Sequence, residues 1–185
     1  MTKCLMIFGL ISIIPCLTLA QGGHSPYAGE EKRQIKALSQ EDIEGYLSGQ
    51  GMGFAKAAEL NRYPGPKHVL ELGGALRLEK EQIDQTKEAY NRMHKEAVSL
   101  GREIVEKERF LDHLFASGRI DAENLREITL EIGTLQGELR AVHLKAHLEM
   151  RQILSPHQIQ RYDELRGYQG AGGKHKHQGH HRGHH

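Results

Sequence analysis

The sequence predicts an all-α protein built around one long antiparallel helical hairpin. Apolar residues recur at helical spacing from Ile83 to Phe115, and a second run of this kind begins after Asp121. Only a short turn at residues 116–119 separates the two runs, and no segment shows the alternating pattern of a strand. Two helices of about 35 residues joined by so short a loop must lie antiparallel.

Shorter helices are expected on either side of the hairpin in the sequence. Ser39 is a suitable N-cap for the first of them, and the Pro64-Gly65-Pro66 breaker separates the second from the third. Pro156 begins the last. These helices are expected over residues 39–47, 54–60, 67–76 and 158–165. The glycines at positions 49, 51 and 53 do not indicate a nucleotide loop, because no strand precedes them and no Walker lysine follows.

The second long helix carries two apolar faces. The face expected to pack in the hairpin comprises Leu125, Ile128, Ile132, Leu135, Leu139, Val142, Ala146 and Ile153. A second apolar line comprises Leu130, Gly137, Ala141, Leu144 and Leu148. A two-helix hairpin cannot bury both faces, so the second line predicts a cover: either the short helix around Val69, Leu70 and Leu72, which would give a compact domain, or a second subunit.

Three glycines lie inside the long helices, where each costs about 0.5–1 kcal/mol relative to Ala. With the hairpin centred near Gly118 and Arg119, Gly101 faces the neighbourhood of Gln136 and Gly137. We therefore expect the two long backbones to approach closely at that level.

Composition limits the classes of function. Of 185 residues, 25 are Lys or Arg and 24 are Asp or Glu, so no charge excess indicates nucleic acid or an anionic membrane as a partner. The unusual counts are 13 His and 21 Gly. No Ser–His–Asp or Cys–His arrangement indicates a nucleophile, so the sequence does not predict an enzyme.

Residues 1–20 are typical of a cleaved export signal, with Lys3 before an apolar stretch and small residues at Thr18 and Ala20. A retained anchor is disfavoured because the apolar run is short for a bilayer, which needs about 20 residues. A lipoprotein at Cys16 is disfavoured because Pro15 precedes it. Cleavage after Ala20 predicts a periplasmic chain without Cys, with a flexible leader (21–38), a helical domain (39–168) and a disordered His/Gly-rich tail (169–185).

Two segments carry a motif typical of a family of bacterial periplasmic proteins. Residues 154–158 (LSPHQ) fit L-T/S-x-x-Q, and residues 78–82 (LEKEQ) form a second copy with Glu79 in place of Thr or Ser. With the export signal and the hairpin, residues 50–168 resemble Spy and CpxP periplasmic chaperones and their zinc-responsive and heavy-metal-resistance relatives. Residues 63–68 and 111–168 look like the heavy-metal-sensor branch.

This resemblance implies a dimeric helical cradle with a role in envelope stress or metal response, and it does not imply an enzyme. The change at Glu79 leaves that expectation intact, because Glu also suits a helix N-terminus and the repeat is expected to act mainly as a capping device.

Three histidines are expected to converge on the hairpin. His143 and His147 are one helical turn apart on one face, a spacing that offers two imidazoles to one ion. The hairpin register places His94 opposite His143 and Tyr90 opposite His147. In the metal-sensor relatives, ligands likewise include His on the long helices. The segment HLKAH lacks the Glu of a zinc hydrolase.

Such a site suits Zn, Cu, Ni or Co, with Glu149 or Met150 near enough to complete it. His68, after the Pro-Gly-Pro breaker, is a further candidate ligand, while His113 and His157 receive no function. A polar pocket or solvated histidines are the alternatives that remain open.

The tail offers a second set of imidazoles: His175, His177, His180, His181, His184 and His185. Other residues interrupt them, unlike the uninterrupted run of a purification tag, so we interpret the tail as a native metal-binding segment.

The first interpretation is a periplasmic metal-binding protein of stress or heavy-metal resistance, which senses or buffers divalent metal and acts as a homodimer. The alternatives are an ATP-independent chaperone that shields unfolded periplasmic clients, and a regulatory partner of a membrane-bound sensor or anti-sigma factor.

Overall fold

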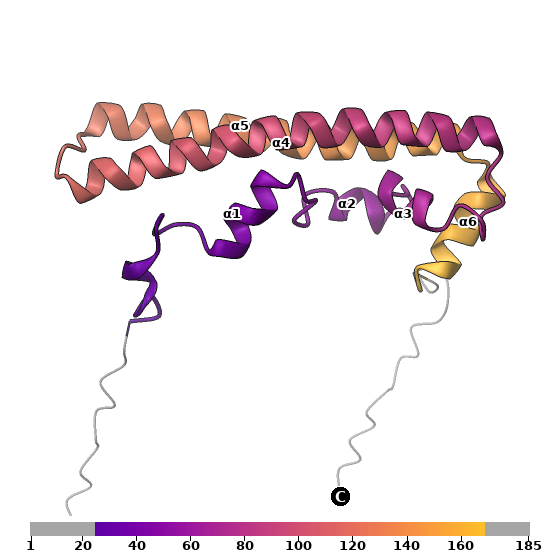
Figure 1. Cartoon of the computed structure of the whole chain (residues 1–185), viewed down its shortest axis with the longest axis horizontal. Coiled ribbons are helices and arrows are strands. Elements are labelled where there is room, and N and C mark those ends of the chain that lie inside the picture. Colours follow the sequence, from indigo (N-terminus) through magenta and orange to yellow (C-terminus); the bar gives the residue numbers. More distant parts are fainter. Residues whose placement is uncertain (1–24, 169–185) are drawn as a thin grey trace, which may run out of the picture. The chain divides into compact units, whose positions relative to one another are not determined.

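The structure, a computed structural model, describes residues 25–168, and this part of the chain is helical without any strand. Its elements are η1 (Glu30–Lys32), α1 (Gln40–Leu47), α2 (Lys56–Glu59), α3 (Pro66–Glu71), α4 (Lys80–Ala116), α5 (Ala122–Ile153) and α6 (Pro156–Leu165). Helices α4 and α5 pack against each other as one long hairpin (Figure 1). The predicted fold class is therefore confirmed.

The helix boundaries follow from local chemistry. The Ser39 hydroxyl accepts from Asp42 N at 3.0 Å, and the Asp42 carboxylate accepts from Ser39 N at 2.9 Å, which closes a capping box on α1. Asp121 caps α5 in the same way, accepting from Glu123 N and Asn124 N. At the hairpin turn Gly118 has a φ of 65°, a conformation that favours glycine.

Two of the short helices are shorter than predicted. Helix α2 forms only over Lys56–Glu59, and α3 ends at Glu71 rather than at residue 76. Beyond α3 the chain turns through Gly73 and Gly74, and Leu78 N donates back to Gly73 O at 3.1 Å. These turn hydrogen bonds replace the last helical turn that the apolar pattern had suggested.

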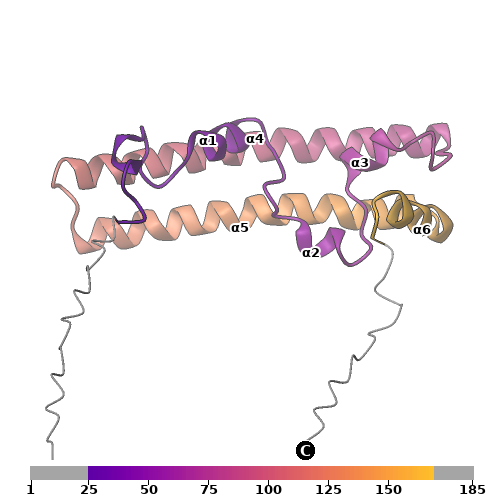
Figure 2. The same cartoon turned by 90° about the horizontal axis from the view of Figure 1, so that it is seen from below.

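The short helices α1, α2, α3 and α6 all lie along one side of the hairpin (Figure 1), and Figure 2 views that side directly. Three buried clusters hold them. The first comprises Ile35, Leu38, Ile43, Tyr46, Ala97, Ile104, Val105 and Leu139. The second comprises Val69, Leu76, Ala89, Met150, Leu154, Ile159 and Tyr162, and the third comprises Leu114, Ile128 and Ile132. Since Ile35 and Leu38 are buried, tight packing begins within the segment expected to be a leader.

The close approach at Gly101 involves a different partner from the one predicted. A Cβ on Gly101 would lie 2.1 Å from the carbonyl oxygen of Tyr46, so the backbone of α1, not of α5, crosses α4 there. Gly133 and Gly137 have open space where a Cβ would be. The expected approach of Gly101 to Gly137 is therefore wrong, because α1 occupies that side of α4.

The second apolar line of α5 remains uncovered. Leu130 is 68% exposed and Leu148 is 54% exposed. The short helix α3 instead buries Val69 against Met150 and Ala89, so its proposed role as the cover of this line is wrong. Leu125, expected in the core, is also exposed.

The two motif copies meet at the open end of the hairpin. The side-chain amides of Gln82 and Gln158 form two reciprocal N–H···O bonds of 2.9 Å each. Gln82 Nε2 also donates to Ile153 O at 2.8 Å, and Gln158 Nε2 donates to Leu76 O at 3.3 Å. Each Oε1 accepts from the backbone N–H of its own helix N-cap, at Glu79 and Ser155. We call this arrangement the glutamine clamp. It confirms that the motifs are capping devices and adds a direct bond between them.

Among the described residues, none of the helices has the length and apolar character needed to cross a bilayer.

Candidate metal site

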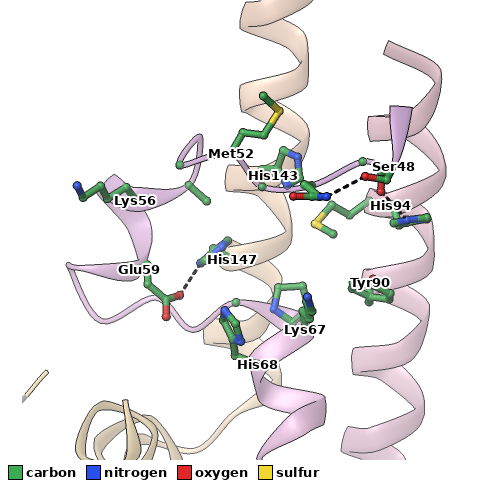
Figure 3. A pocket seen from close by; sticks show the side chains of 18 of the residues that line it. Ser48, Met52, Lys56, Glu59, Lys67, His68, Tyr90, His94, His143 and His147 are labelled. Carbon is green, nitrogen blue, oxygen red and sulfur yellow. Dashed lines mark hydrogen bonds and ion pairs between the residues drawn. The ribbon is translucent and has the colours of Figure 1, made fainter. Parts of the chain in front are cut away.

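The four candidate histidines of the helical domain line one cavity of about 680 Å³. His68 comes from α3, His94 from α4, and His143 and His147 from α5. Figure 3 shows the four rings arranged around the same space, with Tyr90 beside His94 on α4. The hairpin register inferred from the sequence therefore brings His94, His143 and His147 to one level, and α3 adds His68 to the same cavity.

His147 is held with one ring nitrogen free. Its Nδ1 lies 2.7 Å from Tyr63 O. The same nitrogen lies 3.7 Å from Glu59 Oε2 (Figure 3). Both partners accept hydrogen bonds, so Nδ1 donates, and in the neutral ring Nε2 has a lone pair. A Cβ on Gly65 would lie 3.3 Å from Nε2, so the absence of a side chain at Gly65 keeps space open beside that nitrogen. Metal-binding histidines commonly have this outer hydrogen bond.

The rings of His94 and His68 are oriented in the same way. His94 Nε2 lies 3.1 Å from Ser48 O, so this nitrogen donates and Nδ1 is the free one. The ring also stacks on Tyr90, with centroids 5.7 Å apart. His68 Nδ1 lies 2.8 Å from the Glu71 Oε2, which leaves Nε2 free in the neutral ring. Each ring thus has one nitrogen held by an acceptor, while the other has no hydrogen-bond partner among the described residues.

His143 is the least satisfied polar side chain of the cavity. It is only 4% exposed, and its Nε2 is buried without a hydrogen-bond partner. Phe54 stacks on the ring with centroids 6.1 Å apart. Burial lowers the pKa of His143, and the nearby rings of His147 and His94 lower it further. The ring therefore stays neutral at pH 7, the state that metal binding requires.

Glu59 is the carboxylate of the cavity, and aromatic hydroxyls hold it in place. Its Oε1 accepts from Tyr162 Oη at 2.6 Å and from Tyr168 Oη at 3.1 Å, and Arg166 Nε lies 3.4 Å away. Tyr162 is fully buried, and burial together with the Glu59 carboxylate raises its pKa. Tyr162 therefore remains a donor, and Glu59 remains an acceptor whose second oxygen faces His147.

The other side chains considered from the sequence do not line the cavity or lie outside the described residues. Met150 is fully buried in the apolar cluster with Val69, and Glu149 forms an ion pair with Arg92 at 2.7 Å. Neither side chain lines the cavity, contrary to the expectation that one of them would complete the site. His113 is exposed and contacts Arg119, and His157 is exposed at the start of α6. The six tail histidines lie outside the described residues.

Sequence reasoning missed several residues that line the cavity, among them Glu59, Gly65, Met52 and Met93. Met93 could have been found, because it precedes His94 on α4 and belongs to the apolar line of that helix. Glu59 had no such signal, since nothing in the sequence relates α2 to His147.

The arrangement supplies imidazole and thioether donors to one space, the donor types that suit Zn, Cu, Ni or Co. Within residues 25–168, no three His, Cys, Asp or Glu side chains are grouped closely enough to hold an ion as they stand. An ion bound by three of these side chains would therefore need them to move closer together than they are in this structure.

Comparison with known families matches residues 53–161 to the family described as heavy-metal resistance, which belongs to the group with the L-T-x-x-Q motif that includes Spy and CpxP. No match was found among curated proteins or among solved structures. The matched segment runs from the glycine-rich loop before α2 to the middle of α6, so it contains the glutamine clamp and all four cavity histidines. It covers more than half of the chain, and the protein therefore belongs to the heavy-metal resistance family.

Proposed function

We propose that this protein is a non-enzymatic, periplasmic metal-binding protein of heavy-metal resistance that holds one divalent transition-metal ion in the histidine-lined cavity and gathers further ions on its tail. One observation carries the proposal: four histidine side chains from three helices line one cavity. Among them, His143 is buried with an Nε2 that has no hydrogen-bond partner in the described residues, and a buried polar atom without a partner costs about 1–3 kcal/mol. A shift of this ring toward the cavity would give that nitrogen an ion as its partner.

The ion is Zn, Cu, Ni or Co. Neutral imidazole binds all four, and the cavity contains no thiolate that would favour a different class. Protons compete for the free nitrogens, so binding weakens below about pH 6. Because burial lowers the pKa of His143, this ring resists protonation longer than a solvated histidine.

The test separates the cavity from the tail. In the full chain, all six tail histidines are changed to Gln, and the protein is titrated calorimetrically with Zn²⁺ and Cu²⁺. We expect close to one ion per chain. Adding His143→Leu and His147→Leu should abolish this binding while helical circular dichroism persists. His113→Leu, an exposed histidine on α4, is the matched control and should change nothing. A chain with the Gln tail that binds no ion would contradict the cavity site.

Dimerisation is part of the proposal. Leu130 and Leu148 are exposed on α5, and a second copy of the chain is the occupant that would bury them. Sedimentation at micromolar concentration should give about twice the monomer mass. A monomer would contradict this assignment.

A second candidate function is a chaperone that shields unfolded periplasmic proteins. Exposed Phe110, Phe115 and Leu125 near the hairpin turn favour it, because clusters of exposed apolar side chains mark interaction surfaces. Suppression of client aggregation, measured with and without Zn²⁺, tests it. Regulation of a membrane-bound sensor or anti-sigma factor is the remaining candidate, and binding of the purified sensor domain would test that role.

A further inference from the structure

We infer that the histidine-lined cavity binds Cu⁺ more tightly than any divalent ion, and that the thioether of Met93 is the ligand responsible for the difference. This inference rests on the proposed metal site and deepens it by naming the oxidation state of the ion and a ligand other than histidine. It is carried by the position of Met93, by the small number of side chains grouped in the cavity and by the charge of the lining.

Met93 lies on the buried face of α4. Ala89 precedes it by four residues and Ala97 follows it by four, so the three side chains share one face of the helix. Ala89 is 2% exposed and Ala97 is fully buried, each in a different apolar cluster. Met93 between them is only partly buried and lines the cavity. The buried face of α4 therefore opens onto the cavity at the level of Met93.

Met52 also lines the cavity, but its sulfur atom lies against α1. A Cβ on Gly45 would lie 2.8 Å from Met52 Sδ, so this thioether packs over the backbone of α1. Figure 3 shows the Met52 side chain extending away from His94 and His147. Met52 is therefore a matched control for Met93, because both residues border the same cavity and only Met93 lies on the face of α4 that opens onto it.

The donor types and their number favour a soft ion with few ligands. Imidazole binds Zn, Cu, Ni and Co alike, whereas a thioether is a soft ligand that selects Cu⁺. Two or three such ligands satisfy Cu⁺, but zinc sites are commonly four-coordinate. Within residues 25–168, no three His, Cys, Asp or Glu side chains are grouped closely enough to hold an ion as they stand. Met93 with two of the histidines is a complete set for Cu⁺ and an incomplete one for Zn²⁺.

The lining of the cavity also has little negative charge. Among the described residues that line it, Glu59 is the only carboxylate, and this group accepts from Tyr162 Oη at 2.6 Å and lies 3.4 Å from Arg166 Nε. Lys56, Lys67 and Arg166 add positive charge to the lining. The cost of removing an ion from water rises with the square of its charge, so a dication without a free carboxylate beside it is much less stable there than a monocation. The charges of the lining therefore favour Cu⁺ over Zn²⁺, Ni²⁺ and Co²⁺.

The first test compares the two ions in the full chain with all six tail histidines changed to Gln. The protein is kept without oxygen and with ascorbate, so that copper remains Cu⁺. Competition with bicinchoninate measures the affinity for Cu⁺, and competition with a zinc-chelating dye measures the affinity for Zn²⁺. We expect one Cu⁺ per chain, bound about a hundredfold or more tighter than Zn²⁺. Zn²⁺ bound as tightly as Cu⁺ would overturn the inference and leave the cavity site intact, whereas binding of neither ion would overturn the cavity site itself.

The second test compares Met93→Leu with Met52→Leu in the same chain. Leucine has a volume similar to that of methionine, so both variants should keep the helical fold, which circular dichroism checks. We expect Met93→Leu to weaken Cu⁺ binding about tenfold or more and to leave Zn²⁺ binding within about twofold, because the thioether is a ligand of Cu⁺ only. Met52→Leu should change neither affinity. Unchanged Cu⁺ binding in Met93→Leu, or an equal loss for both ions, would overturn the assignment of Met93.

X-ray absorption at the copper edge gives a readout that a packing role of Met93 would not change. We expect a sulfur neighbour of Cu⁺ in the chain with the Gln tail and in Met52→Leu, and no sulfur neighbour in Met93→Leu. A spectrum with nitrogen neighbours alone in all three proteins would overturn the inference.

Discussion

The glutamine clamp and the histidine-lined cavity are two polar regions at different levels of the same hairpin, and they differ in how their polar atoms are satisfied. In the clamp, both amides of Gln82 and Gln158 have partners for every nitrogen and oxygen. In the cavity, His143 Nε2 has none although the ring is buried. Buried polar groups in folded proteins are usually paired, so the clamp has the properties of a structural device, whereas the unpaired nitrogen of His143 is one of the observations behind the proposed metal site.

The largest effect is expected from Gln158→Ala. This change removes the reciprocal amide bonds and leaves Leu76 O and Ser155 N without their side-chain partner, so unfolding free energy should fall by about 2–4 kcal/mol. Urea denaturation measures it. Gln160→Ala, an exposed position on the same helix, should stay within about 0.5 kcal/mol. A similar loss at Gln160 would show that the effect of Gln158→Ala does not come from the hydrogen bonds of the clamp.

The next effect should appear in metal affinity rather than stability. Gly65→Ala places a methyl group 3.1 Å from His147 Cε1 and 3.3 Å from Nε2, so ion binding should weaken about tenfold, or about 1.4 kcal/mol. Gly65 has a φ of −87°, which alanine adopts readily, so the fold should persist. Gly51→Ala also changes the cavity lining but meets open space, and it should bind metal normally. Equal affinity in both variants would argue against His147 as a ligand.

His143→Leu should have a small effect on stability at pH 7.5, within about 1 kcal/mol and in either direction, because it removes a buried nitrogen that has no partner. The pH dependence sharpens this test. The pKa of His143 is lowered by burial, so below the ordinary pKa of about 6.5 the unfolded chain binds a proton that the folded chain excludes. The native protein therefore loses stability as pH falls, and the variant should lose less. Unfolding at pH 7.5 and 5.5 measures both. A loss above about 2 kcal/mol at pH 7.5 would give His143 a structural role.

The smallest effect concerns the two copies of the motif within the clamp. Glu79→Thr restores the residue typical of the motif at the N-cap of α4, and a Thr hydroxyl is a better cap than a long carboxylate side chain, so we expect a gain of about 0.5 kcal/mol. Thermal unfolding measures it, and metal affinity should not change. Ser155→Ala, at the equivalent N-cap of α6, should instead lose about 1 kcal/mol. If both changes had the same sign, the two copies would not be equivalent capping devices.

The sequence by itself determined the all-α class, the long hairpin and the level at which His94, His143 and His147 meet. These features depend on local information: the helical spacing of apolar residues, the caps at Ser39 and Asp121, and a turn too short to allow any arrangement but antiparallel packing. Helical spacing and hairpin register were therefore sufficient to select three of the four cavity histidines, whereas His68 lies on α3, outside the hairpin.

Only the tertiary structure decided which side of the hairpin the short helices cover, and several features follow from that choice. Gly101 approaches Tyr46 of α1, Glu59 of α2 reaches His147, and Leu130 stays exposed. Each depends on contacts between segments far apart in the chain, which local periodicity cannot encode. The free nitrogens of His94 and His147 depend in the same way on the carbonyl groups of Ser48 and Tyr63, so the orientation of the candidate ligands emerged only when distant loops were packed against the hairpin.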